Sequence, residues 1–297
     1  MGGFGGAVIA GALFLVSLSA SAEIRVLCTT TIVGDVVAHV AGADLSVAVL
    51  LPVNADPHSF EATPSDLVEI ARAEVIFENG AGLEAFLAPL LKTTAAYVVD
   101  LSANLPLRAL SPEGAHEGES VDPHVWFDPM NVLVWVDRVA RVLGDVDPDH
   151  ATEYRERAAA YAQSLWDLDA WILEKVSGLP PASRKLVTDH DSFSYFADRY
   201  GFEVIGTVLP GLSAMSEPSA REVAALEAAI LAAKVTAVFV GTTVNPTLAS
   251  QVAADTGARL VVLYTGSLSD ADGPAPTYVD LLRYDVEQIV SALGSSP

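Results

Sequence analysis

Residues 147–178, DPDHATEYRERAAAYAQSLWDLDAWILEKVSG, separate two sets of short apolar runs and decide the architecture. Apolar side chains recur along this stretch at steps of four and three, the spacing of one helix face: Tyr154, Ala158, Tyr161, Leu165, Leu168 and Ile172. Asp147-Pro148-Asp149 predicts the start of a helix and Gly178 its end. At ~1.5 Å per residue such a helix is roughly 40 Å long, enough to cross a two-lobed body. The residues alone leave open whether it joins two lobes or packs on one.

On each side of this helix, β-branched runs alternate with helix-patterned segments, which is typical of βαβ units and parallel sheets. We therefore expect an α/β fold of two lobes with similar plans. The runs before the helix are IRVLCTT (24–30), LSVAVLLP (45–52), AEVIFENG (73–80) and AAYVVDLS (95–102). Those after it are RKLVTDH (184–190), FEVIGTVLP (202–210), VTAVFVG (235–241) and ARLVVLYTG (258–266).

Length and charge narrow the classes of protein. The chain of 297 residues favours two domains, each with a core of its own. It has 16 Lys and Arg against 38 Asp and Glu, a formal net charge of −22, which repels phosphate backbones. Nucleic acid is therefore not expected as a partner.

The N-terminus reads as an export signal. Residues 1–22, MGGFGGAVIAGALFLVSLSASA, are uncharged, run apolar from Ala7 to Val16 and end in an A-x-A-like cleavage pattern. A basic n-region is missing, so a retained anchor is the alternative. The single Cys28 cannot form an internal disulfide, and we interpret it as a small buried apolar residue.

Three of the six histidines carry little functional signal. His39 lies in a helical stretch, His150 opens the long helix, and His116 lies in the polar loop SPEGAHEGES. We expect the first two to be structural or surface residues.

The other three histidines, His58, His124 and His190, lie in loops of the kind that follow strands. In an open parallel sheet, ligands bind outside the carboxyl ends of the strands. Each of these histidines has an aspartate within two residues: Asp56 and Asp122 begin the tripeptide Asp-Pro-His, and Asp189 and Asp191 flank His190. Such carboxylates can accept a hydrogen bond from the imidazole and orient the ring. The residues alone leave a shared metal site and three ordinary loop histidines both open.

The loop that carries His58 is predicted to be short and held at both ends, by the proline before the histidine and by the start of the next helix. Thr63-Pro64-Ser65-Asp66 supplies an N-cap, a proline at the first helical position and an acid in the first turn. Such a loop holds an imidazole in place before any ion binds, as a pre-organised site requires.

Long stretches of the chain, residues 50–87, 122–143, 154–172 and 185–206, resemble the zinc and manganese substrate-binding proteins of bacterial ABC transporters. The likeness runs from about residue 24 to the C-terminus. It implies two α/β lobes with parallel sheets, joined by one long rigid helix, with the ion in the cleft between the lobes. The expected divisions are a signal peptide at 1–22, an N-terminal lobe at 23–145, a linking helix at 146–178 and a C-terminal lobe at 179–297.

The resemblance places the family's first three metal ligands on His58, His124 and His190. Manganese-type members carry a carboxylate at the third position, whereas an imidazole suits zinc better. The fourth ligand, an aspartate in the family, falls on Gly266 of LYTGSLSDADGPAPTY. We expect Asp270 to take that place, with Asp272 or water as the alternatives.

The function implied is that of a monomeric periplasmic receptor that captures Zn²⁺, in preference to Mn²⁺, and delivers it to a membrane ABC permease and its ATPase. A periplasmic zinc chaperone is a possible further partner, and the long His-rich loop of zinc-type members is replaced here by SPEGAHEGES. One alternative is a zinc-dependent hydrolase with a three-histidine site, although no H-E-x-x-H motif is present. Another is an adhesin-like protein on the same fold.

Overall fold

The computed structural model describes residue 2 and residues 24–110, 121–211 and 218–294. The predicted signal peptide, apart from Gly2, and His116 lie outside the described residues. No helix of the described part is long and apolar enough to cross a membrane.

The first half of the described chain forms a parallel sheet with strand order β2-β1-β3-β4. Each strand lies inside one of the four runs that the sequence predicts before the long helix, so that prediction is confirmed. The elements are β1 (Arg25–Cys28), α1 (Thr31–Ala41), β2 (Ser46–Val49), α2 (Pro64–Arg72), β3 (Val75–Glu78), α3 (Ala88–Leu91) and β4 (Tyr97–Asp100).

The second half of the described chain repeats this plan, with strand order β6-β5-β7-β8 and parallel pairing throughout. All of its strands again fall inside the predicted runs. The elements are β5 (Lys185–Thr188), α6 (Ser194–Tyr200), β6 (Glu203–Thr207), α7 (Ala220–Ala233), β7 (Ala237–Gly241), α8 (Thr247–Thr256), β8 (Arg259–Leu263) and α9 (Tyr278–Gly294).

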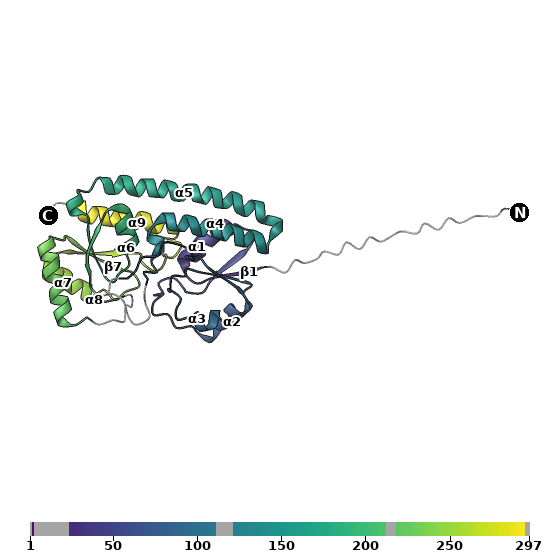
Figure 1. Ribbon diagram of the computed structural model, residues 1–297, viewed down its shortest axis with the longest axis horizontal. Helices are drawn as coiled ribbons and strands as arrows, with labels where there is room; N and C mark the ends of the chain where they lie inside the picture. The colour runs from purple at the N-terminus through teal and green to yellow at the C-terminus, as the bar shows by residue number, and fades with distance from the viewer. Residues whose placement is uncertain (1, 3–23, 111–120, 212–217, 295–297) are drawn as a thin grey trace.

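A helical layer joins the two sheets. Helix α5 extends along the whole body above both lobes, with α4 and α9 beneath it (Figure 1), so the long helix does span two lobes. All six residues of the predicted apolar stripe are buried, and α5 packs on α1, α4 and α9. The connecting elements are η1 (Val125–Phe127), α4 (Pro129–Val146), η2 (Pro148–His150), α5 (Ala151–Ser177) and η3 (Pro181–Ser183).

The lobes share their main core, so the expectation that each has a separate core is wrong in part. One continuous apolar cluster extends from Phe77 in the first sheet through Leu165 on α5 to Phe239 in the second sheet. Smaller clusters, around Ile76 and around Val238, lie on the other face of each sheet. The physical reason is that the same helical layer packs against one face of both sheets, and burying a large apolar side chain contributes about 1.5–3 kcal/mol wherever it lies.

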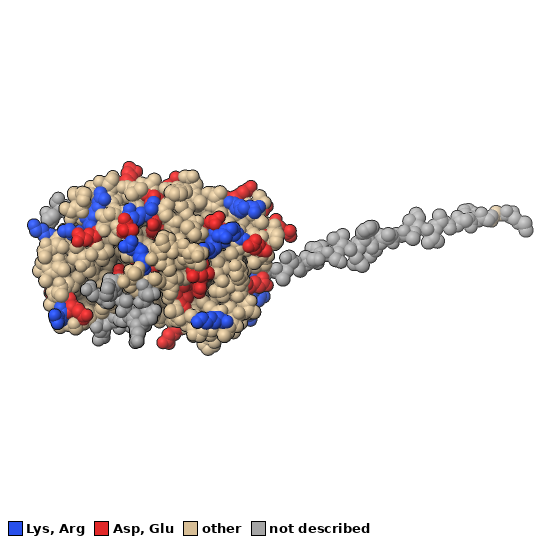
Figure 2. All heavy atoms as spheres, in the orientation of Figure 1, with Lys and Arg blue, Asp and Glu red and all other residues tan. Residues whose placement is uncertain are grey.

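Two features of the composition, the single cysteine and the excess of acidic residues, can be located in the structure. Cys28, in β1, is fully buried, which confirms its interpretation as an apolar core residue. Figure 2 shows acidic and basic side chains interspersed over one face of the protein. The negative charge is therefore not gathered into a single acidic patch on this face.

Candidate metal centre

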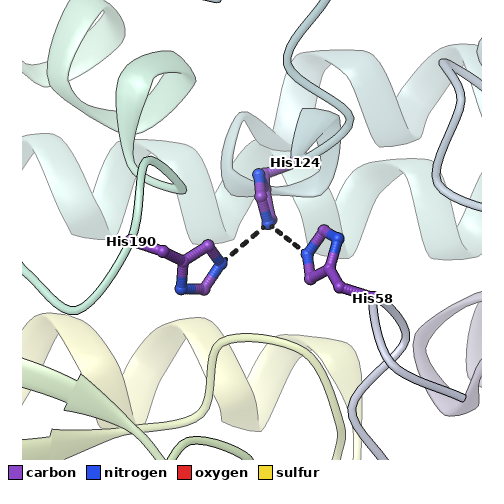
Figure 3. A group of neighbouring side chains, drawn as sticks. All are labelled: His58, His124 and His190. Carbon is purple, nitrogen blue, oxygen red and sulfur yellow. Dashed lines mark hydrogen bonds between the residues drawn. The ribbon is translucent and has the colours of Figure 1, made fainter. Parts of the chain in front are cut away.

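His58, His124 and His190 meet at one point between the two lobes. Figure 3 shows the three rings converging from three separate segments of the chain. The Nε2 atom of His124 lies 3.1 Å from Nε2 of His58 and 3.1 Å from Nε2 of His190. One nitrogen from each ring falls within a group whose members all lie within 4.8 Å of one another. Ligand nitrogens around a tetrahedral zinc ion, with Zn–N of about 2.0–2.1 Å, stand roughly 3.3 Å apart, so this spacing suits a shared ion.

Strand ends and short helices deliver these side chains. His190 follows β5 by two residues, and the loop between β2 and α2 carries His58. His124 stands directly before η1 and is almost completely buried. The predicted hold on the His58 loop is present at its helix end, because the Asp66 carboxylate accepts a hydrogen bond from the Thr63 backbone N–H at 2.7 Å. The carboxyl end of β5 and the loop after β2 thus place two of the rings, as is general for parallel sheets, and the start of η1 places the third.

Two of the three rings are oriented by buried carboxylates. His124 Nδ1 donates to Asp122 Oδ1 at 2.7 Å, and His190 Nδ1 donates to Asp189 Oδ1 at 2.8 Å. Asp189 is itself held by the Gly241 backbone N–H, 2.6 Å from Oδ2. A carboxylate on Nδ1 leaves the lone pair of Nε2 free for a metal ion and raises the basicity of the ring.

His58 is held differently, although its tripeptide is the same. Its backbone N–H donates to Asp56 Oδ1 at 2.9 Å, and Ser59 Oγ donates to Asp56 Oδ2 at 2.8 Å. Among the residues that the structure describes, no carboxylate accepts from the His58 ring. The expectation that Asp56 orients this ring is therefore not met, because its oxygens are occupied within its own turn.

The surroundings set the protonation of the three rings. Burial, together with the neighbouring imidazoles, lowers the pKa of His58 and of His124 well below the usual value. Burial acts in the same direction on His190, but the charge and hydrogen bond of Asp189 outweigh it and raise the pKa of His190. The surroundings therefore disfavour a proton on two of the rings and favour one on the third.

The structure does not bring Asp270 to the site. Asp270 and Asp272 are both exposed, and neither belongs to the group of converging ligand atoms. The turn that carries Asp270 closes on itself instead: Gly273 N–H and Ser269 Oγ donate to the Asp270 carbonyl at 2.8 and 2.9 Å. The structure therefore gives no support to Asp270 as the fourth ligand.

Gly266, where the resemblance would place a carboxylate, serves a contact between the lobes. A Cβ atom at this position would lie 3.0 Å from Pro57 Cδ, tighter than an ordinary contact. The next residues bind the first lobe, because Ser267 Oγ accepts from the Asn54 N–H and the Leu268 N–H donates to Thr31 Oγ1, both at 2.9 Å. A glycine here lets the two loops approach closely.

The structure adds residues that the sequence analysis missed. Ser194 Oγ donates to Asp122 Oδ2, and Tyr195 OH donates to the Asp122 carbonyl at 3.0 Å. Asn79 Nδ2 donates to the Pro123 carbonyl at 3.0 Å. These contacts join segments that are far apart in the chain, so no local sequence pattern predicts them.

The remaining described histidines lie away from the site, as expected. His39 stacks on Tyr161 with ring centroids 4.3 Å apart, and His150 lies on the surface beside Asp147.

Comparison with known proteins agrees with this geometry. Residues 26–292 match the family described as zinc-uptake complex component A periplasmic. The chain is 31% identical over 273 residues to the manganese-binding lipoprotein MntA of Halalkalibacterium halodurans, covering 91% of this chain and 89% of the relative. It is 33% identical over 277 residues to the iron-binding protein YfeA of Yersinia pestis, covering 92% and 87%.

A solved structure shows the same fold. The periplasmic zinc-binding protein TroA of Treponema pallidum superposes with a TM-score of 0.83 at 31% identity, covering 91% of this chain and 99% of that one. The chain therefore belongs to the metal substrate-binding proteins of bacterial ABC transporters, a family of transport proteins and not of enzymes.

Proposed function

We propose that the cargo of this protein is Zn²⁺, held by His58, His124 and His190, with a water molecule as the fourth ligand. The observation that carries the proposal is the donor set: three imidazoles converge, and no carboxylate of the described residues joins them. Imidazole suits zinc, whereas carboxylate and carbonyl oxygens suit manganese. The relatives are named for manganese, iron and zinc, so the donor atoms and not the family favour zinc.

Two oriented rings beside one half-buried ring fit a site that binds an ion and later releases it. Two Nδ1 carboxylates hold His124 and His190 ready for an ion, while His58 lies half-buried on a loop. As a substrate-binding protein of an ABC transporter, the chain works with a membrane permease and its ATPase. We propose that residues 1–22 direct export to the periplasm, that the receptor acts as a monomer, and that any zinc chaperone loads this same site.

The test is elemental analysis of the protein purified without added metal, followed by direct competition between Zn²⁺ and Mn²⁺ at neutral pH. We expect zinc to copurify and to displace manganese. Tighter binding of manganese would contradict the proposal. Absence of tight binding for either metal would favour an adhesin-like role on the same fold. A His39→Ala variant, altered at an exposed histidine outside the converging group, is the matched histidine control.

A further inference from the structure

We propose that Ser194 is a positioning residue of the metal site: its hydroxyl fixes the Asp122 carboxylate, and Asp122 in turn fixes the ring of His124. The inference rests on the proposed function, because it assumes that His124 is a ligand. It assigns a role in cargo binding to a side chain that contacts none of the three imidazoles directly.

The contacts form a continuous relay. Ser194, the first residue of α6, donates from Oγ to Asp122 Oδ2. The other oxygen, Oδ1, accepts both the backbone N–H of His124 at 2.9 Å and its Nδ1–H at 2.7 Å. Asp122 is 1% exposed, so solvent cannot replace a lost partner. Each carboxylate oxygen therefore has a defined task, and Ser194 holds the one that His124 does not use.

Removing the hydroxyl loosens the ring through the carboxylate. The terminal torsion of an aspartate is broad and has no sharp staggered minima of its own, so its orientation depends on hydrogen bonds. With Oδ2 unheld, the carboxyl group can rotate and carry the Nδ1 contact of His124 with it. A ligand set binds an ion tightly only while its rings keep the productive orientation.

Ser194 also links His124 to the lobe that carries His190. Ser194 lies 72 residues beyond Asp122 in the chain and only four beyond His190. The neighbouring Tyr195 OH donates to the Asp122 carbonyl, while Asn79 at the end of β3 holds the Pro123 carbonyl. The tripeptide is therefore held from both lobes, and among the described residues Ser194 is the one outside the tripeptide that bonds the Asp122 carboxylate.

The first experiment measures zinc affinity by chelator competition in Ser194→Ala and Ser194→Thr. Mutating a residue that hydrogen-bonds a metal-bound histidine typically lowers metal affinity by 10–100-fold. Ser194 is one hydrogen bond further from the metal, because it bonds Asp122 and not His124. We expect a loss of roughly tenfold for alanine and recovery for threonine, which keeps the hydroxyl. The visible spectrum of the Co²⁺-loaded protein should change with alanine, because ligand geometry changes, while Ser164→Ala on the surface of α5 should behave like the parent in both measurements.

The second experiment is a double-mutant cycle with Asp122→Asn. If Ser194 acts through Asp122, Ser194→Ala should have no further effect in the Asp122→Asn background. Unchanged zinc affinity in Ser194→Ala, or an equal loss in both backgrounds, would overturn the inference. Failure of the parent to bind zinc would overturn the proposed function together with it, whereas a parent that binds zinc and an alanine variant that matches it would overturn the inference alone.

Discussion

The tripeptide Asp-Pro-His occurs twice in the site, and the two copies behave differently. In both, the aspartate accepts the backbone N–H of the histidine two residues on, at 2.9 Å, as an Asx turn does. In the copy at 122–124 the same carboxylate also binds the imidazole, while in the copy at 56–58 it binds Ser59 instead. The local sequence therefore fixes the turn, and the surroundings decide whether the ring is oriented.

Burial accounts for the difference. Asp122 is sealed between the lobes and held by Ser194 and Tyr195, whereas Asp56 lies half-exposed on a loop. A buried carboxylate must be satisfied by protein groups, and the adjacent ring is the nearest donor. Each of the following predictions tests this comparison or narrows it.

The largest effect should come from removing a ring. His58→Ala, His124→Ala and His190→Ala should each lower zinc affinity by more than about 100-fold, since even outer partners cost 10–100-fold. The fold should persist, because the shared core does not include these rings. Chelator competition and circular dichroism check the two statements, and a variant that binds zinc like the parent would remove that histidine from the ligand set.

The next effect separates the two aspartates. Asp122→Asn should lower zinc affinity by about 10–100-fold, because an amide can donate to Nδ1 and favour the wrong tautomer of His124. Asp56→Asn should cost clearly less, since this side chain does not contact the His58 ring. Isothermal titration of both variants gives the comparison, and equal losses would show that the two tripeptides work alike.

The pH dependence of zinc affinity should reflect the deprotonation of a single imidazole, that of His190. Burial, with the neighbouring imidazoles, lowers the pKa of His58 and of His124, while Asp189 raises the pKa of His190, so below that raised pKa zinc binding should displace one proton from the three rings and not three. Below the raised pKa of His190, affinity should therefore rise about tenfold per pH unit, and above that pKa it should level off. Affinity measured from about pH 6 upward tests this slope, because burial raises the pKa of the Asp122 carboxyl to about 6 and its protonation adds to the loss below that pH. Asp189→Asn should move the levelling point to lower pH, and a slope of three protons would refute the assignment.

The smallest effect concerns the turn near the C-terminus. Asp270→Ala should leave zinc affinity unchanged, because its carboxylate is exposed and outside the converging group. The same titration checks it beside Asp272→Ala. A lower zinc affinity in Asp270→Ala than in the parent would mean that the turn closes over the ion once zinc is bound.

The sequence by itself determined the architecture and the three rings. Period-two and period-3.6 patterns are local, so they locate the strands and the stripe of α5 from Tyr154 to Ile172. They also locate the loops that carry His58, His124 and His190. The resemblance to the family predicts a ligand only where this chain has a suitable side chain at the matching position. It could not supply a ligand at Gly266, where the matching residue has no side chain.

Only the tertiary structure decided how those rings are supported. Ser194, Tyr195 and Asn79 reach the tripeptide at 122–124 from distant segments, and the choice between ring and serine for each aspartate depends on those contacts. The shared core likewise follows from one helical layer packing on two sheets. Hydrogen bonds between remote segments, and the burial of side chains between them, depend on how close those segments lie in space. Periodicity along the chain carries no information about the distance between remote segments.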